Sequence, residues 1–322
     1  MKVAIIGGGV IGGGWAARFL LNGHDVSVYD PAPDSADAVH HVLDNARVAL
    51  DALYEGALPR AGALAFCKSL EEACAGAAWV QESVPERLDL KHSVLGAIVD
   101  VAPATAIIGS STSGFTPTAL HEKLKDPSRV IVAHPFNPVY LLPLVELVGG
   151  DATADQTLEK AKTMLTTIGM KPLVLRKEID AHIADRLLEA VWRESLWLVK
   201  DGVATTEEID DAIRYGFGLR WAQMGLFETY RIAGGEAGMA HFLAQFGPAL
   251  QWPWTKLMDV PELDDALIAR ISEQSDAQAK GRSIAALEAQ RDGNLVAILK
   301  ALAARDEAAG ALLNAHRQSL SS

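Results

Sequence analysis

The chain has 322 residues, and 29 Lys and Arg stand against 41 Asp and Glu, which gives a formal net charge of −12. This length favours two domains, and a hydrophobic content of 49% excludes a disordered or collagen-like chain. The acidic balance, with no basic run, argues against a nucleic-acid partner.

Cysteine content and apolar runs restrict the class of protein further. The two cysteines, Cys67 and Cys74, supply neither a disulfide framework nor the spacing of metal ligands. We therefore expect no metal and a reducing, cytoplasmic location. No stretch reaches the roughly 18 consecutive apolar residues that a membrane span needs, so we expect no membrane association. The apolar N-terminal run is broken by glycines, which indicates folded structure rather than a signal peptide.

The first half of the chain alternates short apolar runs with helical patterns. Residues 3–6 and 26–29 are predicted strands on either side of a glycine turn and a helix over 15–21. Residues 34–65 have a helical pattern, with a turn at Gly56 and Pro59 between two helices. Further strands are predicted at 78–80, 106–109, 129–134, 144–148 and 171–175, with helices at 89–100 and 153–168. This alternation is typical of a mostly parallel, doubly wound α/β sheet.

After Arg176 the pattern becomes helical throughout. A long helix is predicted over 181–200, and another begins near Thr205. The remaining helices are broken at Gly216, Gly218, Gly234–Gly235 and Gly247–Pro248. We expect the residues after about 309 to be frayed or loosely docked. The chain therefore divides into an α/β domain over 1–177 and an all-helical domain over 178–322.

The glycine turn near the N-terminus fits the dinucleotide-binding pattern G-x-G-x-x-G at Gly7, Gly9 and Gly12. The turn follows a strand and opens a helix, so the N–H groups at Val10 and Ile11 can meet a pyrophosphate. Asp30 ends the second strand, where a carboxylate accepts hydrogen bonds from ribose hydroxyls and repels a 2′-phosphate. The sequence therefore predicts a Rossmann-type domain with NAD, rather than NADP, as cofactor. A purely structural turn is the alternative.

A histidine and a glutamate in two later strands suggest hydride chemistry. His134 ends one predicted strand, and Glu146 lies 12 residues later inside an apolar run. A buried carboxylate needs a partner, and His134 is the nearest if the intervening loop folds back. Glu146 would then orient the imidazole, and His134 would remove a hydroxyl proton as hydride leaves for the nicotinamide. Separate structural roles for the two residues are the alternative.

Hydroxyl side chains follow the strand that ends at Gly109. The segment Ser110–Gly114 lies where open α/β sheets bind ligands, so a hydroxyl such as that of Ser111 could hold the substrate oxygen. A Ser/Thr turn is the alternative.

Several motifs together resemble the 3-hydroxyacyl-CoA dehydrogenase superfamily over nearly the whole chain. They are Gly7–Gly12 with Asp30, Gln81–Glu86, Ser110–Gly114, His134–Pro138 with Glu146, and Ile183–Leu188. The resemblance implies an NAD-binding Rossmann domain, a helical dimerisation domain, an active site in the cleft between them and a homodimer. It also implies specific roles for six residues: His134 as base, Glu146 as its partner, Ser113 and Asn137 at substrate and nicotinamide, and Glu86 and Lys91 along the cofactor.

Within this superfamily, some segments are most similar to members that oxidise the 3-hydroxyl of carnitine. These segments are Glu82–Lys91, His134–Pro143, Ala184–Ala190, Asp201–Thr206 and Gly218–Trp221. Carnitine is therefore the expected small-molecule substrate. The alternatives are L-gulonate 3-dehydrogenase, 3-hydroxybutyryl-CoA dehydrogenase and a non-catalytic NAD-binding protein.

Charge and aromatic residues bear on that substrate. Residues 31–66 carry two basic and five acidic side chains, a poor surface for the phosphates of CoA. Asp185 stands where the acyl-CoA members have Asn, so it would either favour a cationic substrate or interact with a helix dipole or Arg186. A trimethylammonium group is recognised by aromatic faces, for which Tyr140 and Trp221 are candidates. Arg220 could pair with a substrate carboxylate, or form a structural ion pair.

Overall fold

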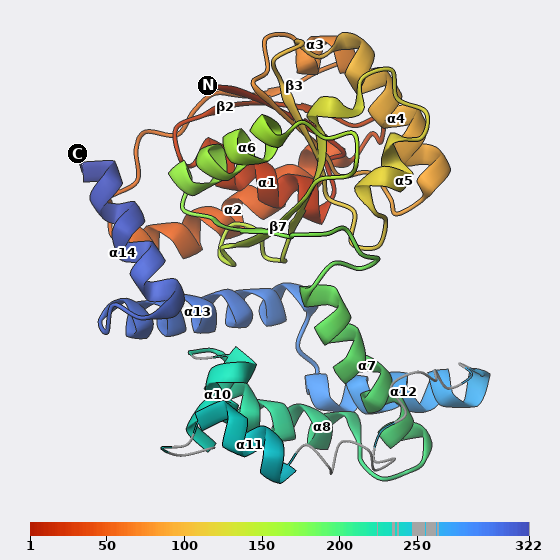
Figure 1. The fold of residues 1–322 in the computed structure, drawn as a ribbon, viewed down its shortest axis with the longest axis vertical. Helices are drawn as coiled ribbons and strands as arrows, with labels where there is room; N and C mark the ends of the chain where they lie inside the picture. Colours follow the sequence, from red (N-terminus) through yellow and green to blue (C-terminus); the bar gives the residue numbers. More distant parts are fainter. Residues whose placement is uncertain are drawn as a thin grey trace. The chain divides into compact units, whose positions relative to one another are not determined.

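Buried apolar strands build a sheet in the order β3-β2-β1-β4-β5-β6-β7-β8 (Figure 1). The computed structural model describes residues 1–223, 225–233, 236, 238–246, 255, 262 and 264–321. The strands are β1 (Lys2–Ile6), β2 (Asp25–Tyr29), β3 (Leu64–Phe66), β4 (Trp79–Glu82), β5 (Ile107–Ser110), β6 (Val130–Pro135), β7 (Leu144–Val148) and β8 (Lys171–Val174). Paired strands are parallel except β6 and β7. The strand order reverses between β1 and β4, which is where such sheets bind ligands.

Helices cover both faces of this sheet and form two hydrophobic cores (Figure 1). On one face lie α1 (Val10–Leu20), α2 (Ser35–Tyr54) and α6 (Asp155–Thr167); on the other lie α3 (Leu70–Cys74), α4 (Leu88–Val101) and α5 (Pro117–His121), and a 3₁₀ turn, η1 (Pro127–Arg129), precedes β6. Trp15 and Phe19 of α1 are fully buried in the first core. The doubly wound α/β fold is therefore confirmed.

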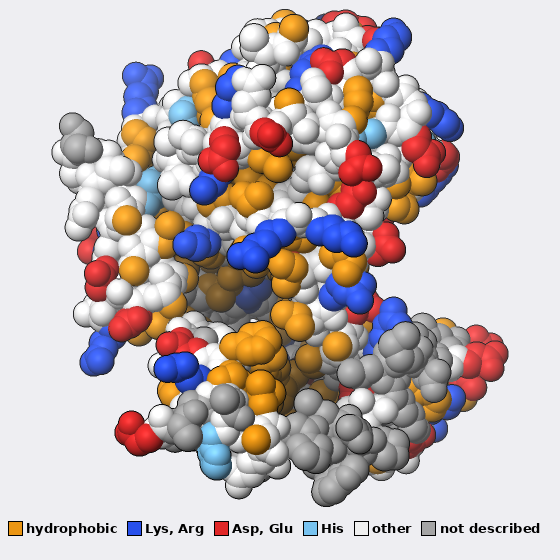
Figure 2. All heavy atoms as spheres, in the orientation of Figure 1, with side chains coloured by type: hydrophobic (Ala, Val, Ile, Leu, Met, Phe, Trp, Pro, Cys, Tyr) orange, Lys and Arg blue, Asp and Glu red, His pale blue; other side chains and the backbone are white. Residues whose placement is uncertain are grey.

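The chain forms two compact units: unit 1 contains Met1–Asp185 and Ala289–Ser322, and unit 2 contains Arg186–Glu288. The later helices are α7 (Ala184–Lys200), α8 (Thr206–Ala212), the π-helical η2 (Ile213–Phe217), α9 (Gly218–Trp221), α10 (Gly225–Ala233), α11 (Gly238–Phe246), α12 (Asp265–Ala279), α13 (Ile284–Ala303) and α14 (Ala308–Ser321). The described secondary-structure elements of unit 2 are all helices, and hydrophobic side chains gather on its face over α10 (Figure 2). The division into 1–177 and 178–322 stays a prediction about domains.

Local sequence signals explain where the helices of unit 2 start and break. Thr205 and Glu208 form a reciprocal capping box at the start of α8. Gly216 has non-helical backbone angles inside η2, in agreement with the helix break predicted at this residue. The predicted breaks at Gly234–Gly235 and Gly247–Pro248 lie outside the described residues.

The second helix that we predicted before residue 65 is wrong. The chain after Pro59 instead forms the short strand β3, which pairs with β2 at the edge of the sheet. Gly62 explains the path, because a Cβ atom there would lie 2.0 Å from the carbonyl oxygen of His24. Backbone packed this closely against a neighbouring strand leaves no room for a helix with side chains.

The predicted fraying or loose docking after residue 309 is also wrong, because α14 packs closely within unit 1. Leu313 and His316 are buried, and the His316 Nδ1 atom lies 2.8 Å from the hydroxyl oxygen of Tyr54 on α2. The Nε2 atom of His316 lies 3.2 Å from the carbonyl oxygen of Thr167. Burial, reinforced by the positive charge of Arg18, lowers the pKa of His316 from 6.5 to about 4.

This lowered pKa makes the docking of α14 sensitive to acid. The unfolded chain binds a proton at this histidine more readily than the folded protein, so the stabilisation is complete above about pH 6.5 and is lost as the pH falls toward about 4. We expect His316→Gln to flatten the dependence of Tm on pH in this window. Thermal unfolding followed by circular dichroism at several pH values measures it. His41→Gln, at an exposed position on α2, is the control, and an unchanged slope in His316→Gln would contradict the assignment.

Candidate active site

The glycine turn after β1 has the geometry that a dinucleotide requires. Gly7 has a φ of +101°, and a Cβ atom there would lie 2.6 Å from the carbonyl oxygen of Ser83. A Cβ atom on Gly12 would lie 1.8 Å from the carbonyl oxygen of Gly7, whereas one on Gly9 would meet no atom within 4 Å. Gly7 and Gly12 are therefore fixed by packing. Gly9 keeps an open surface at the start of α1, where Val10 and Ile11 begin the helix.

Asp30 follows β2 beside this turn and is half-buried. Its Oδ2 atom accepts a hydrogen bond from the Gly8 N–H at 2.6 Å, and its Oδ1 atom accepts one from the Ala32 N–H at 2.8 Å. These bonds hold the carboxylate at the carboxyl edge of the sheet, where the adenosine ribose of a dinucleotide lies in this type of fold. The residues of the turn and Asp30 thus fit NAD.

Glu86 and Lys91 belong to a network of charges between β4, α4 and the 110–114 turn, in which Lys91 is buried and Glu86 is exposed. Lys91 is only 1% exposed, and its Nζ atom lies 2.9 Å from Glu82 Oε1 and 3.3 Å from Glu86 Oε2. Glu86 Oε1 accepts hydrogen bonds from the Thr112 hydroxyl and from the N–H groups of Ser113 and Gly114. Burial would raise the pKa of Glu86, but these bonds and Lys91 outweigh it and lower the pKa. In this structure the ammonium group of Lys91 is therefore paired with Glu82 and Glu86.

The serine segment after β5 is fixed from two sides. The hydroxyl of Ser111 accepts hydrogen bonds from Gln81 Nε2 at 2.8 Å and Trp15 Nε1 at 3.2 Å, and lies 2.9 Å from the Ser83 hydroxyl. Ser113 is half-buried, with its backbone held by Glu86. The segment therefore forms a rigid edge next to the glycine turn.

His134 and Glu146 face each other across the antiparallel strands β6 and β7. Their Cα atoms are register partners, and His134 Nδ1 lies 3.0 Å from Glu146 Oε2. Glu146 has no exposed surface, and its Oε1 atom accepts hydrogen bonds from the N–H groups of Ile183 and Ala184 at 2.9 and 3.0 Å. Burial would raise the pKa of Glu146, but these three bonds outweigh it and hold the pKa below its ordinary value. The carboxylate of Glu146, with its lowered pKa, therefore orients the imidazole through Nδ1 and leaves Nε2 on the other side of the ring.

Two residues at the start of α7 complete the surroundings of His134. Asp185 Oδ2 lies 3.7 Å from His134 Nε2, and the ring of His182 lies 5.5 Å from the His134 ring. His182 is fully buried with its Nε2 atom 3.3 Å from the Thr112 carbonyl oxygen, and burial lowers its pKa. His182 is therefore neutral beside His134. It was not singled out in the sequence, where no local pattern marks it.

Other predicted residues have different surroundings. Tyr140 is buried, and its hydroxyl donates to Asp292 Oδ2 at 2.5 Å. Asn137 is exposed, two residues after β6, and precedes Pro138 through a cis peptide bond. Arg220 and Trp221 lie in α9 of unit 2, where the Trp221 ring packs 4.5 Å from the Phe217 ring and is 39% exposed. The structure thus gathers His134, Glu146, Asp185 and the 110–114 segment in unit 1.

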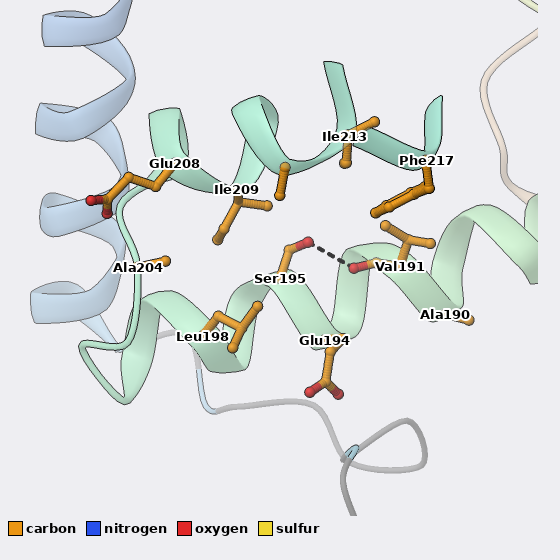
Figure 3. Close-up of a pocket in the computed structure, with 11 residues that line it drawn as sticks. Ala190, Val191, Glu194, Ser195, Leu198, Ala204, Glu208, Ile209, Ile213 and Phe217 are labelled. Atoms are coloured by element: carbon orange, nitrogen blue, oxygen red, sulfur yellow. Dashed lines mark hydrogen bonds between the residues drawn. The ribbon is translucent and has the colours of Figure 1, made fainter. Parts of the chain in front are cut away.

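A large pocket of unit 2 contains none of the site residues described above (Figure 3). It has a volume of about 420 Å³ and lies between α7 and the α8–η2 segment, lined mainly by apolar residues such as Val191, Leu198 and Ile213. Its Ser195 hydroxyl donates to the carbonyl oxygen of Val191 at 2.8 Å. Because no histidine and none of the predicted site residues lines it, the reactive groups of unit 1 are the better candidate site.

Comparisons with known proteins agree with this geometry. The family model for the 3-hydroxyacyl-CoA dehydrogenase NAD-binding domain matches residues 2–179, and that for the C-terminal domain matches 182–266. The first match confirms the predicted NAD-binding domain. A solved structure of 5-formyl-3-hydroxy-2-methylpyridine 4-carboxylic acid 5-dehydrogenase is similar with a TM-score of 0.77 and 28% identity, covering 94% of this chain and 98% of that one.

Curated relatives have much higher identity. L-carnitine dehydrogenase of Mesorhizobium japonicum is 60% identical over 96% of this chain and 85% of its own length. L-carnitine dehydrogenase/betainyl-CoA thioesterase of Agrobacterium fabrum is 62% identical over 98% of this chain. This chain spans 64% of the length of that relative.

The contrast between Gly9 and Gly12 gives a test of the cofactor site. Gly9→Val should fold normally, because its backbone suits any residue and its side chain enters open space. That side chain should weaken NADH binding by about tenfold or more, since it covers the surface a pyrophosphate approaches. Gly12→Ala should instead lower stability by roughly 1–3 kcal/mol through overpacking. NADH fluorescence titration and thermal unfolding measure both effects, and tight NADH binding by Gly9→Val would contradict the site.

Proposed function

Because the chain belongs to the 3-hydroxyacyl-CoA dehydrogenase family, we propose that it is an NAD-dependent dehydrogenase that oxidises the 3-hydroxyl of L-carnitine to 3-dehydrocarnitine. The observation that carries the proposal is the buried His134–Glu146 pair, with Nδ1 and Oε2 3.0 Å apart at the carboxyl edge of the sheet. Relatives named L-carnitine dehydrogenase, at 54–60% identity over most of their length, support the substrate.

His134 acts as the general base in this proposal. Its Nδ1 atom is bound by Glu146, so Nε2 accepts the proton of the substrate hydroxyl. The lowered pKa of Glu146 keeps the carboxylate charged, and that charge stabilises the imidazolium as it forms. NAD, when bound, supplies the carbon that accepts the hydride from C3 of the substrate. The imidazolium then releases its proton to solvent as product leaves.

The remaining predicted residues have positioning roles in the proposal. Gly7, Gly9 and Gly12 hold the pyrophosphate, and Asp30 holds the ribose and disfavours NADP. Glu86 fixes the 112–114 backbone through three hydrogen bonds, so that Ser113 and Ser111 lie at the substrate edge. We assign Asn137, which is exposed at the end of β6, to contacts with substrate and nicotinamide. Arg220 and Trp221 are assigned to the substrate carboxylate and trimethylammonium group.

Charge on α2 favours carnitine over an acyl-CoA. Asp37, Asp44 and Asp51 of this helix are exposed, and Arg47 lies 3.4 Å from Asp44. A surface of this sign repels the phosphates of CoA, which a zwitterionic substrate lacks.

We further propose that the protein is a cytoplasmic homodimer. Apolar side chains of unit 2, including Leu219, Phe227 and Ile232, are more than 60% exposed, and such patches mark association surfaces. Cys67 and Cys74 are free thiols, as a reducing compartment allows. Among the described helices, none has the length and apolar character needed to cross a bilayer.

A substrate panel tests the proposed function directly. Carnitine, gulonate and 3-hydroxybutyryl-CoA are each offered with NAD or NADP, and the absorbance of the reduced nicotinamide is followed. We expect turnover with carnitine and NAD. Turnover confined to gulonate or to the CoA ester would show that this compound, and not carnitine, is the substrate. NADH binding without any turnover would favour a non-catalytic protein.

If His134 is the base, its replacement should lower turnover without changing the affinity for NADH. His134→Asn can still donate to Glu146 but cannot accept the proton, so kcat should fall by about 10²- to 10⁴-fold. The dissociation constant of NADH should not change, because the glycine turn is untouched. Steady-state kinetics and NADH fluorescence measure the two quantities, and turnover near that of the unmodified enzyme would exclude His134 as the base.

A further inference from the structure

A second carboxylate lies on the reactive side of the imidazole. Glu146 contacts His134 at Nδ1, whereas Asp185 Oδ2 lies 3.7 Å from Nε2, the nitrogen that receives the hydroxyl proton. The Asp185 side chain is 20% exposed, so it is not sealed from solvent. A hydroxyl bound to Nε2 at about 2.8 Å therefore has Asp185 as an immediate neighbour.

The backbone before α7 brings Asp185 to this place. Ala181 and His182 both have positive φ values, of 57° and 51°, which non-glycine residues adopt at a cost of about 1–3 kcal/mol each. The turn places the N–H groups of Ile183 and Ala184 on Glu146. Glu146 thus already supplies the negative charge that favours the start of a helix. A second carboxylate, that of Asp185, follows directly after Ala184. Stabilisation of the α7 N-terminus alone does not explain it.

We propose that Asp185 binds the cationic end of the substrate and so determines substrate specificity; this inference rests on the proposed oxidation of carnitine. In carnitine, three bonds separate the hydroxyl oxygen from the quaternary nitrogen, so that a bound hydroxyl brings the nitrogen close to Nε2. A trimethylammonium group has no N–H to donate, and a carboxylate attracts it by charge alone.

The same contact selects between the enantiomers of carnitine. The carbinol carbon carries a hydroxyl, a hydrogen, an ammonium arm and a carboxylate arm. When the hydroxyl is on Nε2 and the hydrogen faces the nicotinamide, the two arms can be exchanged only by inverting the configuration. Asp185 attracts the ammonium arm and repels the carboxylate arm, so one enantiomer is favoured.

The test compares carnitine with a neutral substrate of the same shape. In 3-hydroxy-5,5-dimethylhexanoate a carbon replaces the quaternary nitrogen. The ratio of kcat/KM for carnitine to that for the isostere is measured in the unmodified enzyme and in Asp185→Asn, together with the ratio for the two carnitine enantiomers. These ratios do not depend on how much of a variant is correctly folded. We expect Asp185→Asn to lower the first ratio by about tenfold or more, as for one lost charge pair, and to bring the second toward one.

Two further variants separate the possible causes. Asp185→Glu keeps the charge and should keep most of the preference for carnitine over the isostere. Asp155→Asn removes an exposed acid from the first turn of α6 and should leave both ratios unchanged. If Asp185→Asn lowers the activity on both substrates equally and leaves the enantiomer ratio unchanged, Asp185 is structural and the inference is overturned. If the unmodified enzyme does not oxidise carnitine, the proposed function itself fails, which is a separate result.

Discussion

The burial of the Glu146 carboxylate is the constraint on which this site depends. An ion without contact with water loses several kcal/mol of hydration, and only close partners can compensate for that loss. Here the partners come from two separate parts of the chain: the imidazole of His134 on the neighbouring strand and the N–H groups of Ile183 and Ala184 before α7. Satisfying one charge therefore aligns the imidazole of His134 and fixes the start of the helix that carries Asp185.

A second network of charges, built on the buried Lys91, performs the corresponding task at the carboxyl ends of β4 and β5. Lys91 would be costly to bury alone, but Glu82 and Glu86 both lie within ion-pair distance of it. Glu82 also accepts a hydrogen bond from the Ser110 hydroxyl, and Glu86 holds the backbone of the next turn. The serine segment is thus fixed by the buried Lys91 and Glu82 and by Glu86, whose side chain is 41% exposed. Rigid edges of this kind keep reacting groups in register.

Features set by local pattern could be predicted from the sequence, and those set by long-range packing could not. The glycine turn, the strands and the pairing of His134 with Glu146 follow from periodicity and from the need to satisfy a buried acid. The strand β3 and the docking of α14 depend on close approach to distant backbone and on His316, which leave no local signal. The turn at Ala181 and His182 was also hidden, because positive φ values in non-glycine residues follow from tertiary contacts. That turn gives Asp185 its place beside the base.

The position of charge, more than its total, determines what this protein can accept. A net charge of −12 argues against nucleic acid but distinguishes poorly among small substrates. The exposed acids of α2 lie at the surface, where they would repel polyphosphates. Asp185 lies 3.7 Å from His134, where the dielectric is lower and one charge would have a larger effect. If Asp185 has the proposed role, an Asn at position 185 would keep the shape of the site and remove its preference for a cation.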